Sequence, residues 1–130
     1  SGDKSVLAWF GSADDKYEMF IAGDGGVNGV NSCFWLFGHF ISLEQVRFNG
    51  NFHTEQAKDM SHMFYNCESL QKVDAETLRT DSAENLDNTF ASCKKLRELD
   101  LNGWNTSNVN NFGSLFFFSL HKFMRLTHLI

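Results

Sequence analysis

The segment Met60-Ser-His-Met-Phe-Tyr-Asn-Cys-Glu-Ser-Leu70 contains a phrase, Phe-x-x-Cys-x-x-Leu, that occurs twice in the chain. The two copies lie 26 residues apart. Their residues are Phe64, Cys67 and Leu70, then Phe90, Cys93 and Leu96. A phrase that recurs at a fixed period of about 20 to 50 residues is typical of repeat proteins, in which successive units stack and share one core. We therefore expect equivalent apolar side chains of successive units, Phe64 and Phe90 above all, to meet in a common interior.

The same register extends to four units. The Phe position is filled at intervals of 27, 26 and 26 residues, by Phe37, Phe64, Phe90 and Phe116. Apolar residues also recur six, nine and eleven positions after each Phe: Leu43, Val46, Phe48; Leu70, Val73, Ala75; and Leu96, Leu99, Leu101. This L-x-x-L-x-L spacing is typical of the strand of a leucine-rich repeat.

Each unit is predicted to contain a short helix or helical turn followed by a strand, for example over residues 59–65 and 70–76. Met60, Met63, Phe64 and Cys67 have the spacing of one helix face, and alternation marks the strand. A turn follows, with an apolar residue two positions before a threonine. We expect the apolar side chain to pack inside and the hydroxyl to bond local backbone groups. The three pairs are Phe52 and Thr54, Leu78 and Thr80, and Trp104 and Thr106.

The ends of the chain differ from the middle. Two strand-like runs, 5–11 and 17–22, flank Ser12-Ala-Asp-Asp15 and predict a hairpin that caps the first unit. The last residues are strongly apolar, with few charges. We expect residues 115–130 to form a homodimer contact through an open strand edge, or to be the cut end of a longer array.

The repeat phrases resemble a known family. The stretches Trp104-Asn-Thr-Ser-Asn-Val-Asn-Asn-Phe-Gly-Ser-Leu-Phe116 and Met60 to Leu70 are similar to the F/W-D-T-S-N-V-x-x-M-S-x-M-F-x-x-C-x-S-L repeats of BspA-like leucine-rich repeat proteins. These include the mycoplasma-type surface lipoprotein repeats of unassigned function. The resemblance covers residues from about Val30 to Phe116. It implies a right-handed leucine-rich solenoid on bacterial surface or secreted proteins, used for adhesion or protein binding.

Some residues depart from the family phrase. The chain has no proline, and residues 80–83 read Thr-Asp-Ser-Ala where Thr-Ser-Asn-Val is usual. The fourth unit has Ser119 in place of the cysteine, and it needs one inserted residue for Phe123 and Leu126 to return to register.

Taken together, these observations predict an α/β repeat fold. It is a short right-handed leucine-rich-repeat solenoid, with one parallel strand and one short helix or turn in each coil of about 26 residues and an N-terminal β-hairpin cap. We expect a single domain over residues 1–130, with the cap at 1–26, the repeats at 27–116, and an atypical C-terminal repeat or cap at 117–130.

Composition narrows the range of partners. The formal net charge of −5 at pH 7 argues against nucleic acid, which would require a basic surface. No apolar run approaches the roughly 20 residues of a transmembrane helix. The three cysteines, Cys33, Cys67 and Cys93, occupy apolar repeat positions, so we expect buried free thiols. A Cys67–Cys93 disulfide is the alternative.

The outward positions of the predicted strands form the candidate binding face. Its columns are Gln45, Arg47, Asn49; Lys72, Asp74, Glu76; and Glu98, Asp100, Asn102. From these we select Arg47, Lys72, Asp74, Glu98 and Asp100 as ligand-binding residues for a protein or glycan. Asp74 and Asp100 share one repeat position and would repel each other, which favours a basic partner. Two carboxylates without further spaced ligands do not make a calcium site, so we expect no metal and no cofactor.

No catalytic motif is recognisable in the sequence. We therefore predict a noncatalytic protein-binding or adhesion module, extracellular or at the bacterial cell surface. Two alternatives remain open. One is a carbohydrate-active hydrolase, which would need a cleft between two carboxyl groups, and the other is a purely structural segment of a longer repeat array.

Overall fold

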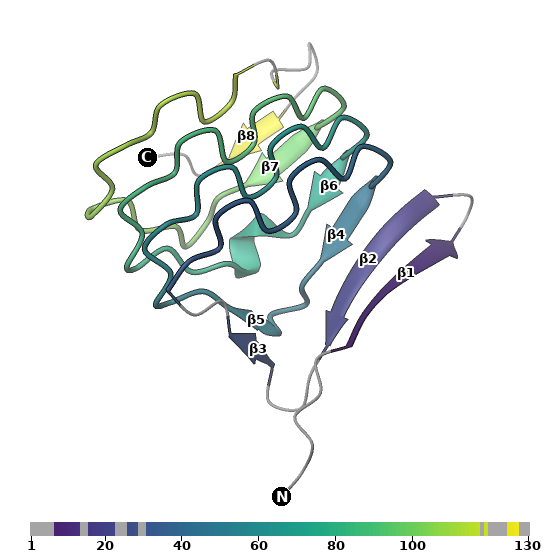
Figure 1. Ribbon diagram of the computed structural model, residues 1–130, viewed down its shortest axis with the longest axis horizontal. Coiled ribbons are helices and arrows are strands. Elements are labelled where there is room, and N and C mark those ends of the chain that lie inside the picture. The colour runs from purple at the N-terminus through teal and green to yellow at the C-terminus, as the bar shows by residue number, and fades with distance from the viewer. Residues whose placement is uncertain are drawn as a thin grey trace, which may run out of the picture.

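The computed structural model describes residues 7–13, 16–22, 26–28, 31–117, 119 and 125–127. Its main body is a series of equivalent segments that follow one another across the molecule (Figure 1). We name them unit 1 (31–57), unit 2 (58–83), unit 3 (84–109) and unit 4 (110–127). The equivalent strands of the four units are, in order, β4 (Gln45–Arg47), β6 (Lys72–Val73), β7 (Glu98–Asp100) and β8 (Arg125–Thr127). Parallel bridges also connect the starts of the units, through Ser32, Asp59, Asn85 and Asn111.

An antiparallel hairpin precedes the units. Strand β1 (Leu7–Ala13) pairs with β2 (Lys16–Ala22), with Ala13 opposite Lys16, which is the pairing that the predicted hairpin requires. Strand β2 then pairs in parallel with β4, so that the hydrogen-bonded sheet has the order β1-β2-β4-β6. The hairpin therefore occupies the position before β4 that another unit's strand would fill. A second parallel pair, β3 (Val27–Asn28) with β5 (Phe52–His53), lies at the turn that follows β4.

The predicted strand over residues 70–76 is too long. Strand β6 contains only Lys72 and Val73, and a single turn of 3-10 helix, η1 (Ala75–Thr77), follows it. The Thr77 hydroxyl donates to the Asp74 carbonyl at 2.7 Å and so supports this turn. Strands β7 and β8 form a separate parallel pair, with Leu126 opposite Leu99. The inserted residue expected in unit 4 is thereby confirmed for Leu126, whereas Phe123 lies outside the described residues.

Residues 61–66 form consecutive turns, and residues 59–65 contain no helix. The amides of Met60, His62 and Phe64 donate to carbonyls of unit 3, at residues 85, 87 and 89. An α-helix would send those amides to carbonyls of its own segment. This alternation is accompanied by left-handed backbone at two positions of the turn segment in units 1, 2 and 3. The residues with φ between 55 and 65° are Trp35, His39, His62, Asn66, Asn88 and Ser92.

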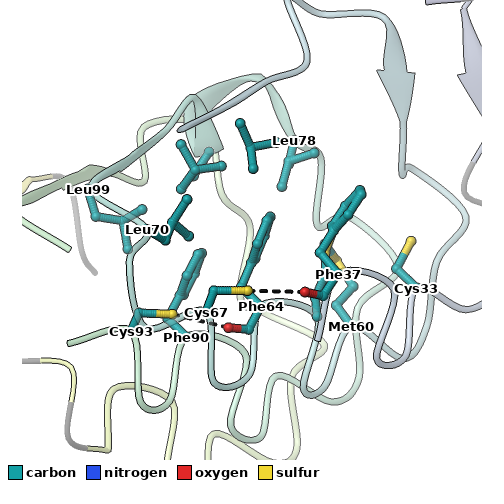
Figure 2. Close-up of a cluster of buried hydrophobic side chains, with 14 of the residues drawn as sticks. Cys33, Phe37, Met60, Phe64, Cys67, Leu70, Leu78, Phe90, Cys93 and Leu99 are labelled. Atoms are coloured by element: carbon teal, nitrogen blue, oxygen red, sulfur yellow. Dashed lines mark hydrogen bonds between the residues drawn. The ribbon is translucent and has the colours of Figure 1, made fainter. Parts of the chain in front are cut away.

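The Phe position forms the centre of the core (Figure 2). The Phe64 and Phe90 rings are fully buried and stack with centroids 5.3 Å apart and planes 4° apart. Phe37 stacks on Phe64 at 5.3 Å, and Phe116 on Phe90 at 6.1 Å. The prediction that equivalent rings meet in the interior is confirmed.

All three cysteines are buried free thiols, as predicted. The Cys67 thiol donates to the carbonyl of Phe37, and the Cys93 thiol to that of Phe64, both at 3.1 Å (Figure 2). In unit 4 the Ser119 hydroxyl donates to the carbonyl of Phe90. The departure from the family phrase at Ser119 therefore keeps the same hydrogen bond with a different donor atom.

The threonines after the turn bond a different partner from the one predicted. The Thr54 hydroxyl donates to the Arg79 carbonyl at 2.7 Å and accepts from the Arg79 amide at 2.9 Å. Thr80 has the same two contacts with Asn105, at 2.9 and 2.8 Å. Each hydroxyl thus satisfies backbone groups of the next unit, 25 residues further on, and joins neighbouring units.

The turn segment of unit 1 is more exposed than the equivalent segments of units 2 and 3. Leu36 is 46% exposed, whereas the equivalent Met63 and Thr89 are fully buried. At the other end of the chain, the predicted homodimer contact falls partly on residues 118, 120–124 and 128–130, which lie outside the described residues.

Candidate functional site

A depression of about 510 Å³ lies on the sheet face over β4 and β6, which we call the sheet-face site. Val46 and Val73 pair in register and are buried, so the residues on either side of each valine point the other way. The lining of the site is formed by Gln45, Val46, Arg47, Asn49, Lys72, Asp74, Glu76 and Thr77.

Two cations of the sheet-face site come from neighbouring strands. The Arg47 guanidinium donates to the Gln45 side-chain oxygen at 3.2 Å. Lys72 Nζ lies 3.7 Å from Glu98 Oε1, and both side chains are more than half exposed. An exposed pair at this distance contributes at most about 1 kcal/mol. A ligand can therefore exchange for Glu98 at low cost.

Asp74 also forms hydrogen bonds that connect unit 2 to unit 1. Its carboxylate accepts the Phe48 amide at 2.8 Å and the Asn49 amide at 2.9 Å, both from unit 1. It therefore satisfies backbone donors of the preceding unit at the point where β4 has ended. Strand alternation places Asp74 on the outer face, but it does not show that the carboxylate reaches back to another unit.

Asp74→Ala is expected to lower the free energy of unfolding by about 2 to 3 kcal/mol, because two amides lose a charged acceptor. Glu76→Ala is the matched control, since Glu76 is an exposed neighbour in the same site. The control should change stability by less than about 0.5 kcal/mol. Urea unfolding of both variants measures the difference, and equal midpoints would contradict the bridging role of Asp74.

The remaining predicted site residues lie on β7, outside the depression. Glu98 joins the site only through its pair with Lys72. Asp100 Oδ1 accepts the Asn102 amide at 2.9 Å. The structure thus brings Arg47, Lys72 and Asp74 together. It adds Thr77, which the outward columns missed because η1 follows β6 where a continuous strand was expected.

A second depression, of about 470 Å³, is wholly polar and was not predicted. The Arg79 guanidinium bonds both carboxylate oxygens of Asp81, at 3.0 and 3.1 Å. These hydrogen bonds hold the pKa of Asp81 below its ordinary value. Asn108 Nδ2 donates to the Asp81 carbonyl at 2.9 Å. The lining residues are Lys58, Asp81, Ser82, Glu84, Ser107, Asn108 and Asn110.

Metal-binding clusters and membrane-spanning helices can be assessed only for the described part of the chain. Within it, no three His, Cys, Asp or Glu side chains gather in a way that could hold a metal ion. Within the same ranges, no helix has the length and apolar character to cross a membrane.

Comparison with known proteins gives one match. No curated protein and no solved structure matches the chain. Residues 31–125, which include units 1 to 3 and most of unit 4, match one family. The match covers well over half of the 130 residues, and so the chain belongs to the family described as "Mycoplasma protein of unknown function, DUF285".

Proposed function

We propose that this chain is a short leucine-rich solenoid of the BspA-like type that serves as a noncatalytic binding or adhesion module. Its setting is the bacterial surface or a secreted protein. The ligand is a protein or a glycan, and the sheet-face site receives it. The observation that carries the proposal is a depression of about 510 Å³ whose lining includes two cations, two carboxylates and two side-chain amides.

The sheet-face site has a rigid base. Val46 and Val73 beneath it are buried in the core shared by the units, and Asp74 ties β6 to the chain after β4. A preorganised surface loses little entropy when it binds a ligand. Gln45 and Asn49 provide side-chain amides that can donate and accept hydrogen bonds, and the Arg47 guanidinium provides several N–H donors. These groups suit the hydroxyls of a glycan or the polar groups of a protein.

The lining also supports a noncatalytic role. Asp74, one of the two carboxylates that line the depression, is occupied by two backbone amides. A glycosidase needs two carboxyl groups that flank the scissile bond and are available for proton transfer or attack. A group held by the fold is poorly placed for that work.

Binding to a glycan array and to immobilised host-cell surface proteins tests the proposal. Arg47→Glu and Lys72→Glu are expected to reduce binding at least about tenfold each, which corresponds to about 1.4 kcal/mol. Lys94→Glu is the matched control, because Lys94 is an equally exposed lysine that pairs with Glu68 away from the site. Thermal unfolding verifies that all three variants are folded.

Equal binding by the Lys72→Glu and Lys94→Glu variants would show that the ligand does not bind at the sheet-face site. Hydrolysis of a bound glycan by the unmodified chain would contradict the noncatalytic role.

A further inference from the structure

The turn segments of neighbouring units are joined by a regular row of hydrogen bonds. In unit 2 the carbonyls of residues 59, 61, 63 and 65 accept the amides of residues 33, 35, 37 and 39 of unit 1. In unit 3 the carbonyls of residues 85, 87, 89 and 91 accept amides of unit 2 in the same way. In each of these units, therefore, the carbonyl of every second residue accepts a backbone amide from the turn segment of the unit before it.

In unit 1 the equivalent carbonyls belong to Ser32, Phe34, Leu36 and Gly38. No hydrogen bond reaches these four oxygens from any residue that the structure describes. Strand β2 covers unit 1 beside β4 only. The turn side of unit 1 thus has four acceptors at alternate residues, in the arrangement that the other units use to bind a neighbouring segment.

Apolar side chains surround this row. Phe34, Leu36 and Ile41 are 54, 46 and 56% exposed. At the equivalent positions unit 2 has the polar Ser61 and Glu68 and the buried Met63. Among the described residues, six large apolar side chains are exposed, and four of them, the three above and Phe40, are in unit 1. A concentration of exposed apolar side chains in one place is characteristic of a binding surface.

We propose that the turn side of unit 1 binds a peptide segment of another protein in the backbone conformation that the turn segments of the units adopt. The peptide would donate alternate backbone amides to Ser32, Phe34, Leu36 and Gly38 and place apolar side chains against Leu36 and Ile41. As in strand addition, the main chain would supply the affinity and the side chains the specificity, but the bound backbone would include left-handed residues, as the segment with His62 and Asn66 does. The interfaces inside the protein indicate what kind of ligand this is. At each of them the equivalent row of carbonyls is bound by the amides of a single chain segment.

A second copy of the protein fits this surface less well. To stack unit 4 of one copy on unit 1 of another, strand β8 would have to lie where β2 already pairs with β4. A single peptide segment needs only the turn side and leaves the hairpin in place. The surface is also distinct from the sheet-face site, since it uses residues 32–41 and none of the residues that line that depression.

A synthetic peptide of residues 58–69 with Cys67→Ser is a suitable probe. In the protein this segment provides the row of amides that binds unit 3, and its lysine, aspartate and glutamate favour solubility. We expect calorimetry to detect binding of the probe to the full chain. N-methylation at the positions of Met60, His62, Phe64 and Asn66 removes the donors. It should weaken binding by about tenfold or more, since each lost hydrogen bond contributes about 0.5 to 1.5 kcal/mol.

Substitutions in the protein test the location of the surface. Leu36→Lys should weaken probe binding at least tenfold. Phe112→Lys, a change of a similarly exposed side chain in unit 4, should leave binding unchanged, and so should Arg47→Glu in the sheet-face site. Equal binding of the N-methylated probe, or no effect of Leu36→Lys in a folded variant, would overturn the proposal. If sedimentation shows a dimer and Leu36→Lys dissociates it, the surface binds a second copy of the protein, and the proposal of a peptide ligand is overturned as well.

Discussion

Phe64→Ala is expected to lower the free energy of unfolding by about 3 to 5 kcal/mol, the cost of removing a buried ring and leaving a cavity. Phe64 is fully buried and stacks on both Phe37 and Phe90, each at 5.3 Å. Neither neighbouring ring can move into the space without leaving its own stack. Urea unfolding followed by circular dichroism measures the loss.

The matched control for Phe64 is Phe34→Ala, because Phe34 lies in a turn segment as well but is 54% exposed. Its truncation removes little buried surface, and we expect a change below about 1 kcal/mol. Similar losses for the two variants would mean that the Phe column is not the centre of the core.

The second large effect is a loss of stability at alkaline pH. Burial raises the pKa of the Cys33 thiol to about 11 and that of Cys67 to about 12, from 9.0. Burial also raises the pKa of Cys93. Below pH 9 the thiols are protonated in both states and the stability is intact. As the pH rises above 9.0, the unfolded thiols ionise while the folded ones stay protonated. Each thiol then lowers the free energy of unfolding by up to about 1.4 kcal/mol per pH unit, until the pH passes its folded pKa.

The thiol contribution can be separated from the titration of lysine and tyrosine. A variant with Cys33→Ala, Cys67→Ser and Cys93→Ser removes the thiols, and the serines can reproduce the hydrogen bond that Ser119 makes to Phe90. Urea midpoints at pH 8 and pH 10.5 should differ far more for the unmodified chain than for the variant. Equal shifts would show that the buried thiols ionise as freely in the folded state as in the unfolded one.

The repeat spacing predicted much of this architecture. The Phe64 and Phe90 stack, the buried cysteines and the pairing of Leu126 with Leu99 all follow from aligning apolar residues at one period. These features depend on which side chains are buried, and periodicity reports burial directly. The solenoid class and its handedness stay predictions.

Other features could not be predicted, because they depend on backbone geometry or on bonds between units. The left-handed residues His62 and Asn66 turn the chain where apolar spacing suggested a helix as one alternative. The outward column placed Asp74 on the sheet face, but its carboxylate bridges to the amides of Phe48 and Asn49. Leu36 holds the repeat position of the buried Met63, yet it is 46% exposed, and no described residue donates a hydrogen bond to its carbonyl.

The hydroxyls of Thr54 and Thr80 have a consequence for the evolution of this family. Each bonds the unit that follows, and it does so through main-chain atoms that every residue type except proline possesses. Recombination that gains or loses one whole period therefore recreates the same junction between whichever neighbours result. The number of repeat units encoded by such a gene can therefore change, while each remaining pair of neighbouring units keeps the same threonine hydrogen bonds.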